Sequence, residues 1–448
     1  MPKPATPDEA HGVAPAALSP REKIAAALYA LLWWIALPLA FARLAWRSRA
    51  EPGYGEHWAE RLGRHAPRPP APRIWVHAVS VGETRAIAPL VEALARARPD
   101  AHFVLTHMTP AGRVAAHQTY ARLIADGRLE SVFAPYDIGF AVRAFLRAFR
   151  PGVCLLMETE IWPNLIRLSA ARGVAVVLVN GRLSARSARR GQRFAALIGP
   201  AVRAVTLATV QTEDDAARMR GFGARALIVA GNLKFDLTPE PAAIALGQEW
   251  RAAVGARTVL VLASTREDGG VAEEQLLLDA LPAARGGALV VIVPRHPQRF
   301  GAVAQLAIER GLGVGRRSAG LPSADIDVWI GDSMGELAAY YTLADAAFVG
   351  GSLLPLGGQN LIEPCACGCP VVTGPSQFNF AEASRLAIEA GALLRVETAT
   401  DVWTALLAIA ADPARRAAMA AAGRAFSARH RGATERNVAV LRALIERV

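Results

Sequence analysis

Cysteine is scarce in this sequence, with four residues among 448. So few cysteines in a chain of this length do not form a disulfide framework, which fits a reduced, cytosolic location. Cys365, Cys367 and Cys369 alternate along one stretch, but metal sites in proteins use C-x-x-C pairs or accompanying histidines. Neither is present near them, so we expect these small residues to pack tightly and to bind no metal.

Acidic residues are outnumbered by basic ones, 39 against 50, which gives a formal net charge of +11. An excess of this size favours an anionic partner. The sequence has no zinc-finger spacing and no RNA-binding aromatic motif, so nucleic acid is not expected. An anionic membrane face or a phosphorylated lipid is the expected partner. Hydrophobic residues make up 52% of the chain, enough for the cores of two domains.

The N-terminal region contains a long stretch without charge. Residues 1–20 are rich in Pro and Ala and predict a disordered leader. Residues 24–42 contain no charged side chain and have about the minimum length for crossing a bilayer. Interface anchors surround this stretch, namely Trp33, Trp34, Trp46, Arg43, Arg47 and Arg49; such a basic cluster keeps the following chain cytoplasmic.

Three interpretations of residues 21–49 compete. A buried helix is possible at this length, and a secretory signal is possible too, although Arg43 directly after Ala42 makes a poor cleavage site. We favour a membrane anchor or in-plane helix at the cytoplasmic face of the inner membrane.

The rest of the chain alternates apolar runs with helical patterns in two blocks, as in doubly wound parallel sheets. The first block predicts strands over residues 73–79, 103–106, 132–134, 153–157 and 174–179. After Pro239 and Pro241 mark a linker, the second block predicts strands over residues 258–263, 289–293, 327–330, 346–349 and 371–373. The predicted domains are residues 50–236 and residues 242–448, the latter ending in a helical tail that is rich in Ala and Arg.

A glycine-rich loop follows the strand at residues 346–349. Glycine pairs turn the chain at residues 350–351 and 357–358, and a helix is predicted over residues 361–367 with Asn360 as its N-cap and Glu363 completing a capping box. Loops that lead into a helix at the carboxyl end of a strand bind anions and nucleotides. An ordinary βαβ turn is the alternative.

Other motifs place polar residues at strand ends. Glu83 lies in HAVSVGET (residues 77–84) and is a candidate functional residue. The alternative is that its carboxylate only stabilises the helix dipole. Glu158 and Glu160 lie in METEIWPN (residues 157–164). The remaining motifs are NGRLS, GNLKFD, PRHP and GDSMGEL, at residues 180–184, 231–236, 294–297 and 331–337.

Taken together, these motifs resemble those of the Kdo transferases, enzymes that add 3-deoxy-D-manno-octulosonic acid (Kdo) to lipid A precursors. The order GGS…GG-x-N-x-x-EP…G-x-PV…GP…FNF carries the resemblance at residues 350–380, and G-Y-x-E-x-W-x-E-R-x-G extends it to residues 53–63. Gly55 stands where many relatives have Arg, and Gln359 stands where many have His. The family implies the GT-B fold: two doubly wound, Rossmann-like domains with a cleft between them, after an N-terminal apolar helix.

The resemblance also implies roles for individual residues. It makes Glu83 the general base, Glu158 a support for the transition state and Lys234 a charge stabiliser. Donor (CMP) contacts would come from Pro294, Arg295, Met334, Gly335, Glu336, Asn360, Leu361, Ile362 and Glu363. Further substrate contacts would come from Ser80, Gly82, Arg182, Gly351 and Ser352.

The implied reaction is an inverting transfer of Kdo from CMP-Kdo to a lipid A precursor (lipid IVA), in the synthesis of the lipopolysaccharide inner core. Neither a metal nor another cofactor is expected, because the sequence Asp325-Ile326-Asp327 leads into a strand and does not suit a metal–diphosphate site. Two alternatives are another GT-B nucleotide-sugar enzyme, either a transferase or an epimerase, and a non-catalytic, membrane-tethered binding protein.

Overall fold

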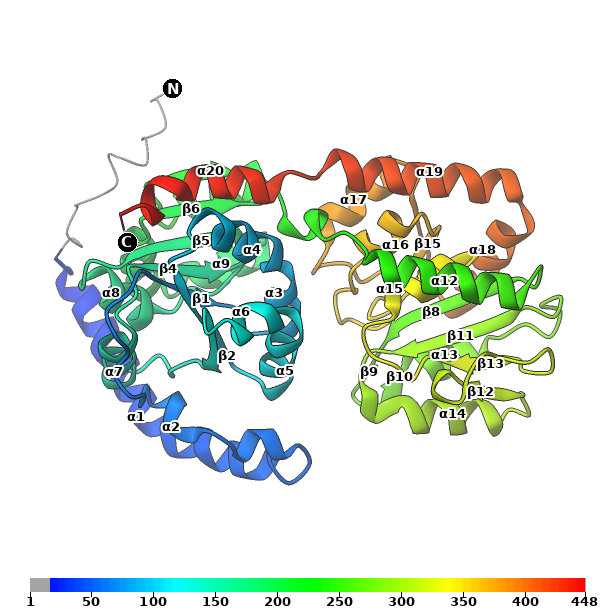
Figure 1. Cartoon of the computed structure of the whole chain (residues 1–448), viewed down its shortest axis with the longest axis horizontal. Coiled ribbons are helices and arrows are strands. Elements are labelled where there is room, and N and C mark those ends of the chain that lie inside the picture. Colours follow the sequence, from blue (N-terminus) through cyan, green and yellow to red (C-terminus); the bar gives the residue numbers. More distant parts are fainter. Residues whose placement is uncertain (1–16, 448) are drawn as a thin grey trace. The chain divides into compact units, whose positions relative to one another are not determined.

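The computed structural model describes residues 17–447, which form two compact units (Figure 1). Unit 1 extends to Asp236 and also takes in the chain from Arg431 onward, and unit 2 is Leu237–His430. Most of the predicted leader lies outside the described residues, and Ser19 already caps the first helix.

Unit 1 is built on a parallel sheet of seven strands in the order β3-β2-β1-β4-β5-β6-β7, with helices on both faces (Figure 1). The strands are β1 (Arg73–His77), β2 (His102–His107), β3 (Leu129–Phe133), β4 (Val153–Met157), β5 (Ala175–Gly181), β6 (Leu207–Val210) and β7 (Leu227–Val229). The helices are α1 (Pro20–Arg47), α2 (Trp58–Arg61), α3 (Val81–Ala86), α4 (Ala88–Ala97), α5 (Pro110–Thr119), α6 (Ala121–Ala125), α7 (Gly139–Phe149), α8 (Pro163–Ala170), α9 (Ala185–Gln192), α10 (Ala195–Arg203), α11 (Glu213–Arg220) and α20 (Ala433–Ile445).

Unit 2 repeats this plan with the strand order β12-β13-β11-β8-β14-β15-β16. The strands are β8 (Val259–Thr265), β11 (Leu289–Pro294), β12 (Val314–Arg316), β13 (Val328–Ile330), β14 (Ala346–Val349), β15 (Val371–Thr373) and β16 (Leu393–Arg395), with β9 (Glu267–Asp268) and β10 (Val271–Ala272) as a separate hairpin. The helices are α12 (Pro241–Val254), α13 (Glu273–Asp279), α14 (Phe300–Ile308), α15 (Leu337–Leu343), α16 (Ile362–Cys367), α17 (Ala381–Glu389), α18 (Ala399–Ala411) and α19 (Pro413–Arg429).

The central strands explain why both sheets lie inside their units. All five residues of β1 are buried, and alternate side chains enter different cores, Ile74 and Val76 on one face and Trp75 on the other. A strand covered on both faces needs continuous apolar sequence rather than alternation. The predicted GT-B fold class is confirmed in these two doubly wound sheets.

The structure adds strands and one break that the sequence pattern did not reveal. β6, β7, β12 and β16, which are three or four residues long, were not predicted. The helical segment after β1 is interrupted at Ile87, between α3 and α4. Pro89 lies in the first turn of α4, where the missing N–H of proline is tolerated.

The C-terminal tail also differs from its predicted place in the second domain. α18 and α19 belong to unit 2, but α20 belongs to unit 1, where Leu441, Leu444 and Ile445 join the core. Thr209 on β6 donates to Asn437 at 2.6 Å, and Asp236 accepts the backbone N–H of Gly432 at 2.7 Å. An amphipathic pattern shows that a helix is covered on one face, but not which sheet covers it.

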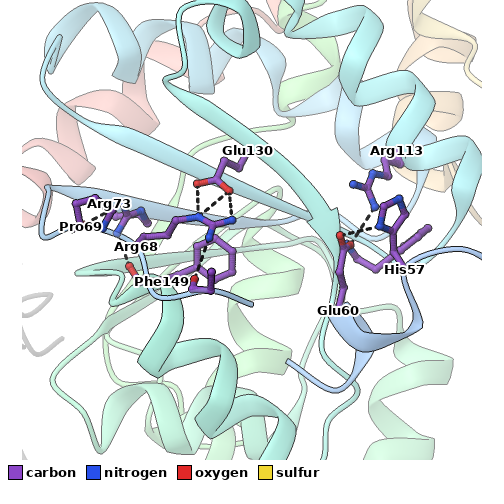
Figure 2. Close-up of polar contacts among 10 residues, drawn as sticks. His57, Glu60, Arg68, Pro69, Arg73, Arg113, Glu130 and Phe149 are labelled. Carbon is purple, nitrogen blue, oxygen red and sulfur yellow. Dashed lines mark hydrogen bonds and ion pairs between the residues drawn. The ribbon is translucent and has the colours of Figure 1, made fainter. Parts of the chain in front are cut away.

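The apolar helix α1 is continuous through Pro38. By length and composition it is able to cross a membrane, with a mean hydropathy of 2.0 over its most apolar window, and none of that window is buried inside unit 1. The motif at residues 53–63, which follows α1, packs closely against α7 of unit 1. A side chain at Gly63 would collide with the Ala141 carbonyl, and Gly63 has φ +70°. Figure 2 shows Glu60 paired with Arg113, and Arg68 with Glu130.

We predict that Leu441→Ala destabilises unit 1 alone. Deleting a buried leucine side chain costs about 2–5 kcal/mol, and this leucine contacts only the core of unit 1. Hydrogen exchange followed by mass spectrometry should show faster exchange in β1, with β8 unchanged. The exposed neighbour Arg442 serves as the control, since Arg442→Ala should change the free energy of unfolding by no more than about 0.5 kcal/mol. Faster exchange of β8 would contradict the assignment of α20 to unit 1.

Candidate active site

The carboxyl ends of the parallel strands carry most of the candidate residues. In unit 1 the strand order reverses between β1 and β4, and in unit 2 it reverses between β8 and β14. Ligands of open α/β sheets bind where the order reverses, beyond the carboxyl ends of the strands. Glu83 follows β1 and Glu158 follows β4, so the two glutamates flank the switch point of unit 1.

Glu83 is held in place by its own turn. Ser80 is the N-cap of α3, and its hydroxyl accepts the Glu83 N–H at 3.3 Å. The same hydroxyl donates to Glu83 Oε1 at 3.1 Å, and the Val79 N–H donates to Glu83 Oε2 at 2.8 Å. Gly82 is exposed, and an added Cβ there would meet only the Ser80 hydroxyl. The carboxylate is therefore fixed beside an open stretch of backbone.

A group of carboxylates changes the acidity of Glu83. Burial, followed by the nearby charges of Glu160 and Glu158, raises the pKa of Glu83 to about 8. Burial also raises the pKa of Glu160, although the Trp162 indole N–H donates to that carboxylate at 2.6 Å. The Trp162 ring rests edge-on against His77 at 4.5 Å. Burial lowers the pKa of His77 to about 3, so this histidine is a neutral support.

Glu158 forms an ion pair with Lys234, with 2.7 Å between Oε1 and Nζ. Both side chains are mostly buried, with exposures of 12% and 17%. Glu158 has a positive φ of 50°, and its carbonyl accepts the Arg182 N–H at 3.3 Å. The structure thus brings Glu158, Lys234 and the backbone of Arg182 together.

Asn180 joins these parts and was missed from the sequence. Its amide donates to Glu158 Oε1 at 3.4 Å, and its carbonyl oxygen accepts the Leu233 N–H at 3.0 Å. Leu233 begins the 3-10 turn that carries Lys234. Asn180 is buried and has φ +56°, a conformation that asparagine tolerates better than most residues. An asparagine at the end of a predicted strand was the available signal.

In unit 2 the glycine-rich loop is organised by a buried carboxylate that was also missed. Glu273 has no exposed surface. Its Oε2 accepts the N–H of Gly351 at 2.6 Å and of Arg266 at 2.9 Å, and its Oε1 accepts the N–H of Ser352 and of Leu353, each at 2.9 Å. Glu273 and Ser352 lie 79 residues apart, and the contact was missed because no local sequence pattern links α13 to the loop.

This support changes how two predicted substrate contacts are understood. The N–H groups of Gly351 and Ser352 already donate to Glu273. Ser352 is fully buried, and its hydroxyl donates to the Val349 carbonyl at 2.6 Å and accepts the Gly374 N–H at 2.9 Å. Ser352 is therefore part of the support of the loop, and its role as a substrate contact stays a prediction.

The predicted capping box at the glycine-rich loop is also corrected. α16 begins at Ile362, and its N-cap is Leu361, which makes no side-chain cap. Asn360 instead accepts the Ile362 N–H at 3.1 Å, two residues on, as an Asx turn does. Leu361 and Ile362 are buried, whereas Asn360 and Glu363 are half-buried.

The other predicted donor residues follow neighbouring strands of unit 2. Pro294 ends β11, and Arg295 comes next, with its N–H donated to the Thr265 carbonyl at 3.0 Å. Met334 and Gly335 are exposed beyond β13. Glu336 is less available, because Arg317 donates to it at 3.0 Å and Ser333 at 2.5 Å.

Arg266 is a further cation at this edge that the sequence analysis did not single out. It directly follows β8, and its side chain lies near the position of a Cβ on Gly351. Both Arg295 and Arg266 lower the pKa of His296, after burial as the main cause. Arg295 donates its backbone N–H to Thr265, the residue before Arg266, so the backbones of the two arginines lie side by side at the edge of the sheet.

Within residues 17–447, no group of three or more His, Cys, Asp or Glu side chains is placed to hold a metal ion. The cysteines of the glycine-rich segment are packed instead. Burial raises the pKa of Cys365 and of Cys367 to about 12, so both are thiols at neutral pH.

Comparison with known proteins identifies the family. A model of the family described as 3-deoxy-D-manno-octulosonic-acid transferase (kdotransferase) matches residues 56–237. The 3-deoxy-D-manno-octulosonic acid transferase of Bordetella pertussis is 44% identical over 413 residues, which cover 90% of this chain and 96% of that protein. The chain belongs to the Kdo transferase family. It is a glycosyltransferase that transfers Kdo in lipopolysaccharide synthesis.

A second relative extends over almost the whole chain. The Kdo transferase of Haemophilus influenzae is 34% identical over 435 residues, or 94% of this chain and 98% of that protein. The UDP-GlcNAc 2-epimerase structure from Neisseria meningitidis has a TM-score of 0.55 at 13% identity and covers 83% of this chain and 100% of that one. At that identity the epimerase shares the fold alone, so the epimerase alternative is not supported.

We predict that Asn180→Asp lowers kcat by about 5- to 150-fold, the equivalent of about 1–3 kcal/mol for a lost buried hydrogen bond. Aspartate still accepts the Leu233 N–H but repels Glu158. The melting temperature should also fall, because the new carboxylate is buried beside Glu158, and the KM for the donor should stay the same. Kinetics with matched thermal melting would check this.

Asn180→Ala is the comparison variant for this prediction. It loses both hydrogen bonds and strains an alanine at positive φ, so it should lower the melting temperature as well. Normal kcat in Asn180→Asp, or a loss of kcat that simply follows the loss of stability in both variants, would contradict the positioning role.

Proposed function

We propose that this Kdo transferase moves Kdo from CMP-Kdo to a hydroxyl of a lipid A precursor, with inversion at the anomeric carbon. The observation that carries the proposal is the fixed Glu83 carboxylate with its raised pKa. A general base is most effective when its pKa lies near the working pH. The bond from the anomeric carbon to the phosphate oxygen of CMP breaks, and CMP leaves with the electron pair. The acceptor oxygen bonds to that carbon and gives its proton to Glu83.

Glu158 and Lys234 have electrostatic roles in this proposal. An oxocarbenium-like transition state carries positive charge on the sugar, which a carboxylate such as Glu158 stabilises. Lys234 meets the negative charge that develops on the leaving group. Ser80 positions Glu83, Gly82 leaves room beside it, and Arg182 binds a carboxylate or a phosphate through its planar fork.

The donor is assigned to unit 2. Its phosphate would be met by Arg295, with Arg266 as a second cation near the glycine-rich loop. Exposed Met334 and Gly335, together with Asn360 and Glu363, would contact the nucleotide. The support of the loop by Glu273 favours a preformed donor site, because the backbone is held before any ligand arrives.

The acceptor and the location are linked in the same proposal. A lipid A precursor is a phosphorylated lipid of the inner membrane, which suits a chain with net charge +11. The exposed apolar helix α1 supports membrane association, and the basic residues after it support the cytoplasmic face.

Glu83→Gln is predicted to lower transfer by about a hundred- to ten-thousandfold, because the amide cannot accept a proton at neutral pH. CMP binding should not change. In the unmodified enzyme the base is active only when ionised, so kcat/KM should rise with pH through about 8. Rates measured from pH 6 to 10 on protein with a normal thermal transition would check both statements.

Glu160→Gln is the matched variant for the pH profile. Removing a neighbouring negative charge lowers the pKa of Glu83, so the rising limb should move to lower pH while transfer persists. A folded Glu83→Gln variant with near-normal turnover would overturn the assignment of the base and make Glu158 or Glu160 the next candidate.

Arg295→Ala is predicted to weaken CMP binding about ten- to a hundredfold, the equivalent of about 1.5–3 kcal/mol for a charged contact. Isothermal titration calorimetry with CMP would measure it. The CMP affinity of Arg295→Lys should lie between those of the unmodified enzyme and Arg295→Ala, because lysine keeps the charge but not the planar fork of the guanidinium group. Arg415→Ala, at an exposed position on α19, should leave the affinity unchanged. Unaltered CMP affinity in Arg295→Ala would show that the phosphate binds elsewhere.

A further inference from the structure

Helix α1 is attached to unit 1 at its beginning. Glu22, in the first turn, forms an ion pair with Arg203, the last residue of α10. Two turns later, the Tyr29 hydroxyl donates to Asp137 Oδ2 at 2.9 Å. Asp137 is buried and also accepts the Leu165 N–H at 2.6 Å, so this contact of α1 reaches the start of α8 inside the unit.

The middle and the end of α1 are attached as well. The Trp33 ring packs on Tyr136 with 5.6 Å between centroids, and the Phe41 ring packs on Trp58 at 5.3 Å. Leu44 is buried in the same cluster. Beyond the helix, Glu60 is paired with Arg113 and accepts the Phe133 N–H at 2.7 Å, which ties the following chain to β3 (Figure 2).

The opposite face of α1 is an exposed apolar stripe. Its side chains recur at helical spacing and are 56–69% exposed. We call this set the α1 stripe, and it consists of Ile24, Leu28, Leu31, Leu32, Ile35, Leu39 and Trp46. Soluble monomers rarely expose apolar residues in one continuous patch of this kind.

These two faces exclude a bilayer crossing in this arrangement. Crossing requires about 20 residues within a hydrocarbon layer of about 30 Å. The contacts with unit 1 run from Glu22 to Leu44, which leaves no such length free of the unit. Unit 1 cannot enter the hydrocarbon with them, because its loops would expose unpaired backbone groups there.

We infer that α1 lies in the plane of an anionic lipid surface, with the α1 stripe in the acyl region and the other face docked on unit 1. Both ends of the helix then stay on the side of the membrane that holds unit 1. This inference rests on the proposed function, because a lipid acceptor brings the enzyme to a membrane.

Charge favours lipid over a second copy of the chain as the occupant of the stripe. Arg21 and Lys23 are exposed near its start, and Arg43 and Arg49 near its end. Residues 23–50 contain no acidic side chain. An apolar face flanked by cations and containing tryptophan is typical of interfacial helices that bind anionic lipids. A second copy would bring the same cations together.

Cross-linking in native membranes tests the docked arrangement. In the full-length chain, Glu22→Cys with Arg203→Cys should be joined by a short bismaleimide into an intramolecular product. Leu39→Cys with Arg203→Cys is the matched control, since 17 helical residues separate position 39 from position 22 by about 25 Å. The Arg203→Cys single variant controls for the natural cysteines, of which Cys367 is the one that is not fully buried. Membrane-bound protein that gives no product with the first pair would overturn the inference.

Vesicle binding tests the occupant. Leu28→Glu with Ile35→Glu should lower binding to vesicles containing phosphatidylglycerol at least tenfold, with an unchanged thermal transition because these side chains face away from unit 1. Binding should also be weaker to pure phosphatidylcholine. Unchanged vesicle binding by the double variant would overturn the inference. It would also be overturned if the original chain bound no vesicles and sedimented as a dimer, while the double variant sedimented as a monomer. Kdo transfer measured on the same preparations separates this outcome from a failure of the proposed function.

Discussion

The parallel direction of every strand in the two large sheets is the constraint on which the candidate site depends. It places all carboxyl ends at one edge of each sheet, so residues far apart in the sequence gather there. Glu83 and Glu158 meet in this way after β1 and β4, as do Arg266 and the glycine-rich loop after β8 and β14. The chemistry of each unit is therefore concentrated where its strand order reverses.

Buried polar groups hold the loops and charged side chains at these sheet edges in place. Glu273 receives four backbone N–H groups and holds the glycine-rich loop. Asn180 connects the Glu158 carboxylate to the turn that carries Lys234. A buried polar atom without a partner is costly, so these contacts favour a single arrangement. Rigid supports of this kind keep charged side chains in place before a substrate binds.

Much of the fold could be predicted from sequence because its central strands are apolar. β4 and β14 were predicted with the bounds that the structure shows, whereas the edge strands β7 and β16 were not predicted. Glu83 and Glu158 were found through motifs at strand ends. No role was predicted for Asn180, although it lies in a strand-end motif, or for Glu273 and Arg266, because their importance comes from partners that lie far away along the chain or on another strand.

The sequence by itself determined the family, the two doubly wound sheets and the apolar character of α1, since these depend on local composition and on motifs within short segments. The tertiary structure decided that α20 returns to unit 1, that Ser352 is buried support, and that one face of α1 is docked while the other is exposed. These outcomes depend on which surfaces meet after the chain has folded. A helical period shows that a face is apolar, but the partner of that face is set by packing between distant segments.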